Sequence, residues 1–185
     1  GTVWNSSTVT SLTITGTPVV NVTSVGSTAI NVYAGQPSEA NSISFNFTGG
    51  TYALLFGYLT GTPAVRNLNF TGYAGTFTID VGANTVVYGN LTFSSGMTVA
   101  SSTATMTFGA TSGTKTITTN AKTLDFALIS FNGVGGTFQL QDALTIGSTR
   151  TATLTNGTLD LNGFTYTVGT SFTTATGTKN LTFNG

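Results

Sequence analysis

Cysteine and histidine are both absent from this chain, and their absence removes several classes of protein at once. Disulfide bonds are excluded, so stability must come from packing and from backbone hydrogen bonds. Catalytic triads that use histidine or cysteine are excluded, as are zinc sites built from these residues. The Gly-Gly-x-Gly-x-Asp repeat that binds calcium is also missing. The sequence therefore predicts no metal and no cofactor.

Charged residues are scarce as well: five acidic and five basic side chains make up 5% of the chain, and the net charge is zero. A nucleic-acid-binding surface requires clustered basic residues, but the cations are dispersed, at Arg66, Lys115, Lys122, Arg150 and Lys179. Neither nucleic acid nor an anionic membrane surface is an expected partner. No apolar run approaches the ~20 residues of a transmembrane helix, so membrane insertion is not expected.

Residues that favour helices are few, whereas threonine is the commonest residue, with 42 copies, and glycine follows with 24. Threonine is β-branched and suits strands. Apolar and polar residues alternate, as in half-buried strands, over residues 8–15, 42–48, 76–81, 103–108, 114–118, 137–140, 151–155 and 164–168. Between them, pairs such as Asn132-Gly133, Gly135-Gly136 and Asn156-Gly157 predict turns. Residues 35–40, which hold the sole glutamate, predict an exposed loop.

A short phrase recurs along the chain: an apolar residue, a Thr, Asn or Ser, a second apolar residue, and then polar residues and Gly. Its copies lie at residues 12–16, 68–72, 91–96, 129–133 and 181–185. A related phrase ends at Gly49, and Phe47, Phe70 and Phe93 follow one another at steps of 23 residues. Such a step suits one coil of a β-solenoid. The sequence therefore predicts an all-β, parallel β-helix-like solenoid with Phe47, Phe70 and Phe93 in one interior column.

An antiparallel β-sandwich, Ig-like or jelly roll, is the alternative architecture. Its strands come at spacings of about 8 to 12 residues with hairpin turns, and Asn-Gly pairs favour hairpins. Either architecture fits a single repetitive β domain over residues 1–185. Because the pattern runs into both ends of the sequence, we expect this domain to be one unit of a longer array or filament.

Residues 152–169, Ala-Thr-Leu-Thr-Asn-Gly-Thr-Leu-Asp-Leu-Asn-Gly-Phe-Thr-Tyr-Thr-Val-Gly, resemble a phrase of long, repetitive β-rich proteins. These are the fibre-like and adhesin-like proteins of environmental bacteria and their phages. Residues 1–5 also resemble a phrase of those arrays, where it follows a segment similar to residues 177–183. The resemblance implies a structural or adhesive role and no catalytic residues. A composition rich in Thr, Ser, Asn and Gly separately favours an extracellular, cell-surface or virion location.

Five carboxylates are the candidates for acid–base chemistry: Glu39, Asp80, Asp125, Asp142 and Asp160. A glycosidase needs two of them across the scissile bond, ~5 to ~9.5 Å apart, and a solenoid could bring Asp142 close to Asp160. Isolated aspartates more often accept hydrogen bonds from backbone amides at turns. We therefore expect that the protein is not an enzyme.

Three further residue patterns bear on function. Asn-x-Ser/Thr triplets, which a composition rich in Asn and Thr also forms by chance, give possible glycosylation sites at Asn5, Asn21, Asn46, Asn69, Asn90, Asn156 and Asn180. Aromatic residues that could stack on sugars are Trp4, Tyr33, Tyr52, Phe56, Tyr58, Tyr73, Tyr88 and Tyr166. Alternate threonines, which share one face of a strand, occur at 8/10, 13/15, 76/78, 105/107, 114/116/118, 151/153/155 and 165/167.

Together these patterns predict a structural subunit of an extracellular or virion fibre, which assembles with copies of itself through β-strand stacking. A glycan-binding adhesin or tail-fibre module, with surface glycans as partners, is the alternative function. Ice binding through a face of alternate threonines, as in ice-binding β-solenoids, is a second alternative. The threonine pairs do not recur at one constant step along the sequence, which counts against a regular face of this kind.

Overall fold

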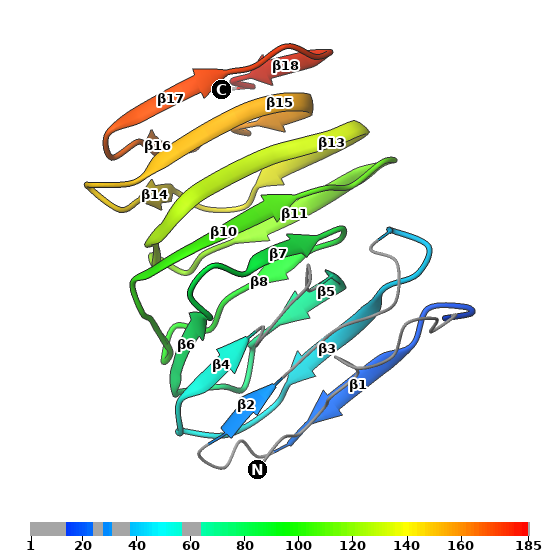
Figure 1. Cartoon of the computed structure of the whole chain (residues 1–185), viewed down its shortest axis with the longest axis vertical. Helices are drawn as coiled ribbons and strands as arrows, with labels where there is room; N and C mark the ends of the chain where they lie inside the picture. Colours follow the sequence, from blue (N-terminus) through cyan, green and yellow to red (C-terminus); the bar gives the residue numbers. More distant parts are fainter. Residues whose placement is uncertain (1–13, 24–27, 31–37, 57–63, 185) are drawn as a thin grey trace.

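The computed structural model describes residues 14–23, 28–30, 38–56 and 64–184, and in these residues the protein is a β-solenoid without a helix (Figure 1). Every strand pairing in the described part is parallel, and each strand pairs with the strand one coil away. Leu68 lies beside Leu91 and Phe131 beside Leu154, in each case 23 residues further along. The predicted coil length is confirmed, and the antiparallel sandwich is wrong.

The strands form three faces, which the chain visits in turn in each coil. The first face consists of the first halves of β3 (Ile43–Phe47) and β5 (Ala64–Asn69), β7 (Asn84–Val87), β10 (Ser102–Phe108), the first halves of β13 (Phe126–Leu140) and β15 (Thr151–Asp160), and β17 (Ser171–Thr174). The second face consists of β1 (Val19–Val22), the second halves of β3 and β5, β8 (Leu91–Thr92), β11 (Thr114–Thr118), the second halves of β13 and β15, and β18 (Lys179–Thr182).

The third face is made of two short stacks of strands. One stack contains β2 (Thr28–Ile30), β4 (Leu54–Phe56), β6 (Thr76–Ile79) and β9 (Thr98–Val99). The other contains β12 (Thr123–Leu124), β14 (Leu144–Ile146) and β16 (Tyr166–Thr167). No helix among the described residues is long and apolar enough to cross a membrane.

The core is a continuous column of apolar side chains between the three faces. The rings of Phe47 and Phe70 are stacked, with centroids 4.8 Å apart and planes 9° from parallel, and Phe93 follows 5.6 Å from Phe70. All three side chains are fully buried. A second stack joins Phe108 to Phe131 at 5.1 Å. Because parallel pairing places the same position of each coil above the last, a repeated Phe becomes a stack of rings.

Several turns expected from the sequence are corners within long strands. Residues 132–136 lie inside β13 and residues 156–157 inside β15, where both strands bend from the first face to the second. Gly135 and Gly157 have positive φ at these bends, and a Cβ on Gly157 would collide with the carbonyl oxygen of Gly133. Glycine is therefore needed for close approach between coils as well as for the bend, and no hairpin forms.

Two other expected segments differ from the structure. The strand expected over residues 8–15 lies mostly outside the described residues, and residues 14 and 15 are not in a strand. In the loop expected over residues 35–40, residues 35–37 lie outside the described ranges. Glu39, at its end, is not a free loop residue, since its side chain is only 19% exposed and contacts residues of a distant coil.

Replacing Phe70 by alanine tests the aromatic column directly. Phe70 lies between Phe47 and Phe93, and Phe70→Ala leaves a cavity that neighbouring coils cannot close without breaking their register. We expect a loss of about 3–5 kcal/mol in the free energy of unfolding, measured by urea titration of dilute protein. The matched control is Phe183→Ala, at a side chain that is 65% exposed. Equal losses for the two variants would contradict the column's role.

Candidate functional site

Asp142 is a structural carboxylate that joins two coils. Its Oδ1 accepts hydrogen bonds from the backbone N–H of Thr119 at 2.8 Å and from the Thr119 hydroxyl at 3.1 Å. Its Oδ2 accepts one from the N–H of Asn120, where the chain adopts a left-handed turn. The carboxylate thus holds the turn of the preceding coil. Asp80 acts locally, accepting from the N–H of Val81 at 2.8 Å.

Asp125 and Glu39 lie in ion pairs. Arg150 Nε is 2.6 Å from Asp125 Oδ1, and its Nη2 donates to the hydroxyl of Ser101. These three residues come from three successive coils. They therefore tie neighbouring coils together at one corner of the solenoid.

Among the described carboxylates, Glu39 makes the contacts that are most distant in the sequence. Its Oε2 accepts from the N–H and the hydroxyl of Thr111, 72 residues away, at 2.7 and 2.6 Å, and Lys115 Nζ is 3.1 Å from its Oε1. Its backbone oxygen accepts from Arg66 Nη2. Burial acts to raise the pKa of the Glu39 carboxyl, but the bonds from Thr111 and Lys115 outweigh it, so the pKa lies below its usual value.

Asp160 is the most buried of the five carboxylates, with 6% of its surface exposed. It accepts hydrogen bonds from Gln139 Nε2 at 3.0 Å, from the N–H of Asn162 at 3.0 Å and from Asn184 Nδ2 at 2.9 Å. Burial acts to raise the pKa of its carboxyl, but the donated hydrogen bonds together lower it below its usual value. Each predicted acid thus has backbone or side-chain partners in the fold, and Asp142 and Asp160 bind different segments.

The possible glycosylation sites occupy both exposed and half-buried positions. Asn21, Asn90 and Asn180 are exposed, Asn46, Asn69 and Asn156 are half-buried, and Asn5 lies outside the described residues. Two of the half-buried amides belong to ladders between coils: Asn46 Nδ2 donates to Asn21 Oδ1 at 3.0 Å, and Asn156 Nδ2 donates to Asn132 Oδ1 at 2.8 Å. A glycan on Asn46 or Asn156 would replace one of the two hydrogens on the nitrogen that donates in this ladder and would place a bulky group beside the neighbouring coil.

Among the aromatic residues considered for sugar stacking, those that the structure describes do not share a surface. Phe56 and Tyr73 are in the core, and Tyr73 donates from its hydroxyl to the backbone oxygen of Tyr52. Tyr88 and Tyr166 are half-buried, and Tyr52 is 58% exposed. The remaining three, Trp4, Tyr33 and Tyr58, lie outside the described residues.

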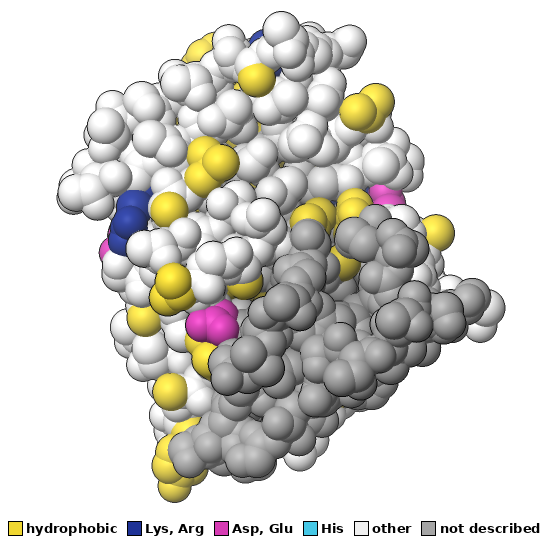
Figure 2. All heavy atoms as spheres, in the orientation of Figure 1, with side chains coloured by type: hydrophobic (Ala, Val, Ile, Leu, Met, Phe, Trp, Pro, Cys, Tyr) yellow, Lys and Arg dark blue, Asp and Glu magenta, His cyan; other side chains and the backbone are white. Residues whose placement is uncertain are grey.

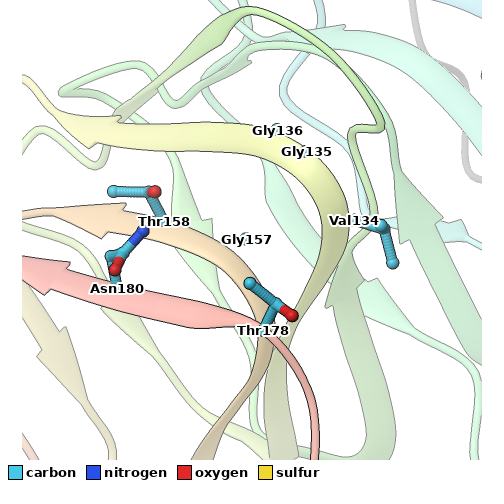
Figure 3. A pocket seen from close by; sticks show the side chains of 7 residues that line it. All are labelled: Val134, Gly135, Gly136, Gly157, Thr158, Thr178 and Asn180. Carbon is cyan, nitrogen blue, oxygen red and sulfur yellow. The ribbon is translucent and has the colours of Figure 1, made fainter.

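An open hollow of about 460 Å³ lies where β13 bends away from β15 (Figure 3). It is lined by uncharged residues, namely Val134, Gly135, Gly136, Gly157, Thr158, Thr178 and Asn180. Sequence reasoning missed it because it arises from unequal coils. Asn132 of β13 pairs with Asn156 of β15, and Thr137 pairs with Thr158. Between these two pairs β13 has more residues than β15, so its chain bulges outward.

The coil formed by β16, β17 and β18 has inward-facing side chains that no described residue covers. Leu181 pairs with Leu159, yet Leu181 is 36% exposed whereas Leu159 is fully buried. Phe183, two residues further, is 65% exposed, whereas the equivalent Leu161 is 7% exposed. The hydroxyl of Tyr166 in β16 is buried and has no hydrogen-bond partner. Leu181, Phe183 and the β17–β18 edge make up what we call the uncovered coil. Figure 1 shows β17 and β18 at one end of the stack of strands.

Comparison with family models, with curated proteins and with solved structures finds no match for this chain. The uncovered coil is therefore identified as the candidate functional site on its geometry alone.

The acid stability of the protein tests the role of Asp160. Because the folded-state pKa lies below the unfolded value of about 3.8, the carboxylate stabilises the fold above about pH 4. This stabilisation is lost as the pH falls through the folded-state pKa. We expect Asp160→Asn to lower the free energy of unfolding at pH 7 by about 1.5–3 kcal/mol and to flatten its fall in acid.

The control is Asp80→Asn, which removes the same charge from a carboxylate that bonds to the adjacent Val81. We expect it to stay within about 0.5 kcal/mol of the wild type at pH 7. Denaturant unfolding at a series of pH values measures both variants. Identical profiles for the two would show that the buried hydrogen bonds of Asp160 do not stabilise the fold.

Proposed function

We propose that this protein is a structural, non-enzymatic module of an extracellular or virion fibre, and that it assembles by stacking one coil on another. The observation that supports this most is the uncovered coil. Leu181 and Phe183 have the inward orientation of core residues, but a further coil is needed to bury them. That coil would come from a neighbouring unit of an array, in the same polypeptide or in another copy of this chain.

The energetics of covering this coil favour association. Complete burial of a Leu or Phe side chain contributes roughly 1.5–3 kcal/mol. The outer edge of β17 and β18 also carries backbone groups that a further parallel strand would pair, and such edges associate unless they are blocked. Charged side chains are one common block, but Lys179 is the sole charge in residues 161–184. Its Nζ donates to the backbone oxygens of Ala175 and Gly177.

A glycan-binding role is the second candidate, and the hollow beside Val134 favours it. Thr158, Thr178 and Asn180 provide neutral hydroxyl and amide groups, which suit hydrogen bonds to sugar hydroxyls (Figure 3). The hollow contains no aromatic side chain on which a sugar ring could stack. Immobilised glycans, screened with the wild type and with Thr158→Ala, test this role. One glycan that binds the wild type and not the variant would support it.

Electron microscopy of the purified protein tests the assembly proposal. We expect rods or filaments whose length grows with protein concentration, because each added coil buries Leu181 and Phe183. The double variant Leu181→Lys/Phe183→Lys places two charges at this surface and should remain as short particles with the same circular dichroism spectrum.

The matched control is Tyr52→Lys/Val81→Lys, which introduces the same charges at side chains that are 58% and 75% exposed and lie outside the uncovered coil. It should form filaments like those of the wild type. Discrete monomers of the wild type at high concentration, or filaments of normal length from the Leu181→Lys/Phe183→Lys variant, would refute the proposal.

A further inference from the structure

The first face carries two columns of outward-facing side chains in strict register over four strands. The register pairs place Thr105, Leu128, Thr151 and Ser171 in one column and Thr107, Ser130, Thr153 and Thr173 in the other. Every member except Leu128 carries a hydroxyl. Two irregularities explain why the sequence did not predict this array. The coil of Leu128 lies between two threonine pairs, and the last step, from Thr151 to Ser171, is 20 residues rather than 23.

The array has regular spacings in two directions. Neighbouring strands lie ~4.8 Å apart, and alternate residues of one strand lie about 6.6 Å apart. β-Branched threonine has few χ1 states in a strand, so its methyl and hydroxyl groups are held in place without a large loss of entropy on binding. Thr153 and Thr173 fix each other further, with their hydroxyl oxygens 2.9 Å apart. The columns therefore form a rigid surface rather than a set of independent side chains.

This surface is also free of charge and leaves hydroxyls available. Thr105, Thr107 and Ser130 form no side-chain hydrogen bond within the described protein, and their outward faces contact solvent. Figure 2 shows mostly neutral groups over β10, β13, β15 and β17, with basic side chains only at the left and top edges of the view. The other faces differ. The second has one threonine column, Thr114, Thr137 and Thr158, but it also includes the charged Lys115 and Lys179. The third has a column of three threonines, Thr123, Thr145 and Thr167, and a separate pair, Thr76 and Thr98.

We propose that these two columns bind ice. A crystalline water surface presents oxygen atoms at fixed repeats of a few ångströms, comparable to the two spacings of the array. A rigid grid of hydroxyls and methyls can hold a layer of water in positions that such a lattice shares, at little entropic cost. A charged side chain would orient nearby water around itself, so the neutrality of this face is part of the fit. The columns exist within one chain, so binding does not require assembly into a fibre.

Ice-affinity measurements with the fluorescently labelled protein test this proposal. The wild type should be incorporated into a slowly growing ice hemisphere and should slow recrystallisation of ice in a frozen film. Thr153→Tyr puts a ring in the centre of the array and should abolish both effects. Thr153→Ser keeps the hydroxyl and should retain part of them.

The control is Thr145→Tyr, the same substitution in the middle of the column of three threonines on the third face. It should bind ice like the wild type, and thermal melts of all variants establish that they fold. Exclusion of the wild type from ice, or equal losses for Thr145→Tyr and Thr153→Tyr, would overturn the proposal. Retention of the wild type on microcrystalline cellulose or chitin, without incorporation into ice, would overturn it in favour of a crystalline polysaccharide.

Discussion

Parallel pairing of each coil with the next is the constraint on which the rest of the structure depends. It places equivalent side chains one above another at the spacing of a β-sheet, so the identity of one residue is repeated along the axis. Phe47 and Phe70 stack because they occupy one inward position, and Asn132 and Asn156 bond because they occupy one outward position. The same rule leaves Leu181 as a core residue that no described coil covers.

The few charges of the chain follow the same rule. Arg150, Asp125 and Ser101 belong to three successive coils, and Asp142 accepts hydrogen bonds from a turn one coil before it. Glu39 extends this to a longer distance, since it contacts Thr111 and Lys115 from a segment near the start of the described chain. Contacts between coils thus account for most of the carboxylates. This distribution fits a module whose main task is to keep its coils aligned, as the proposed fibre role requires.

The sequence predicted features that recur at a constant step and missed those produced by unequal coils. A step of 23 identified the solenoid and the position of Phe70 between Phe47 and Phe93. Offsets between paired residues range from 20, between Thr151 and Ser171, to 26, between Leu91 and Ile117. Such variation hid the two hydroxyl columns and the hollow beside Val134. Asn-Gly and Gly-Gly pairs did not distinguish a hairpin from a corner of the solenoid, because both need the same backbone freedom.

Fibre diffraction from oriented filaments of the purified protein is the most direct test of coil-on-coil assembly. If filaments grow by stacking coils, strands lie across the filament axis and the strand spacing of ~4.8 Å appears as a reflection along that axis. A reflection of this spacing perpendicular to the axis would show that the solenoids pack side by side, and would contradict stacking through Leu181 and Phe183.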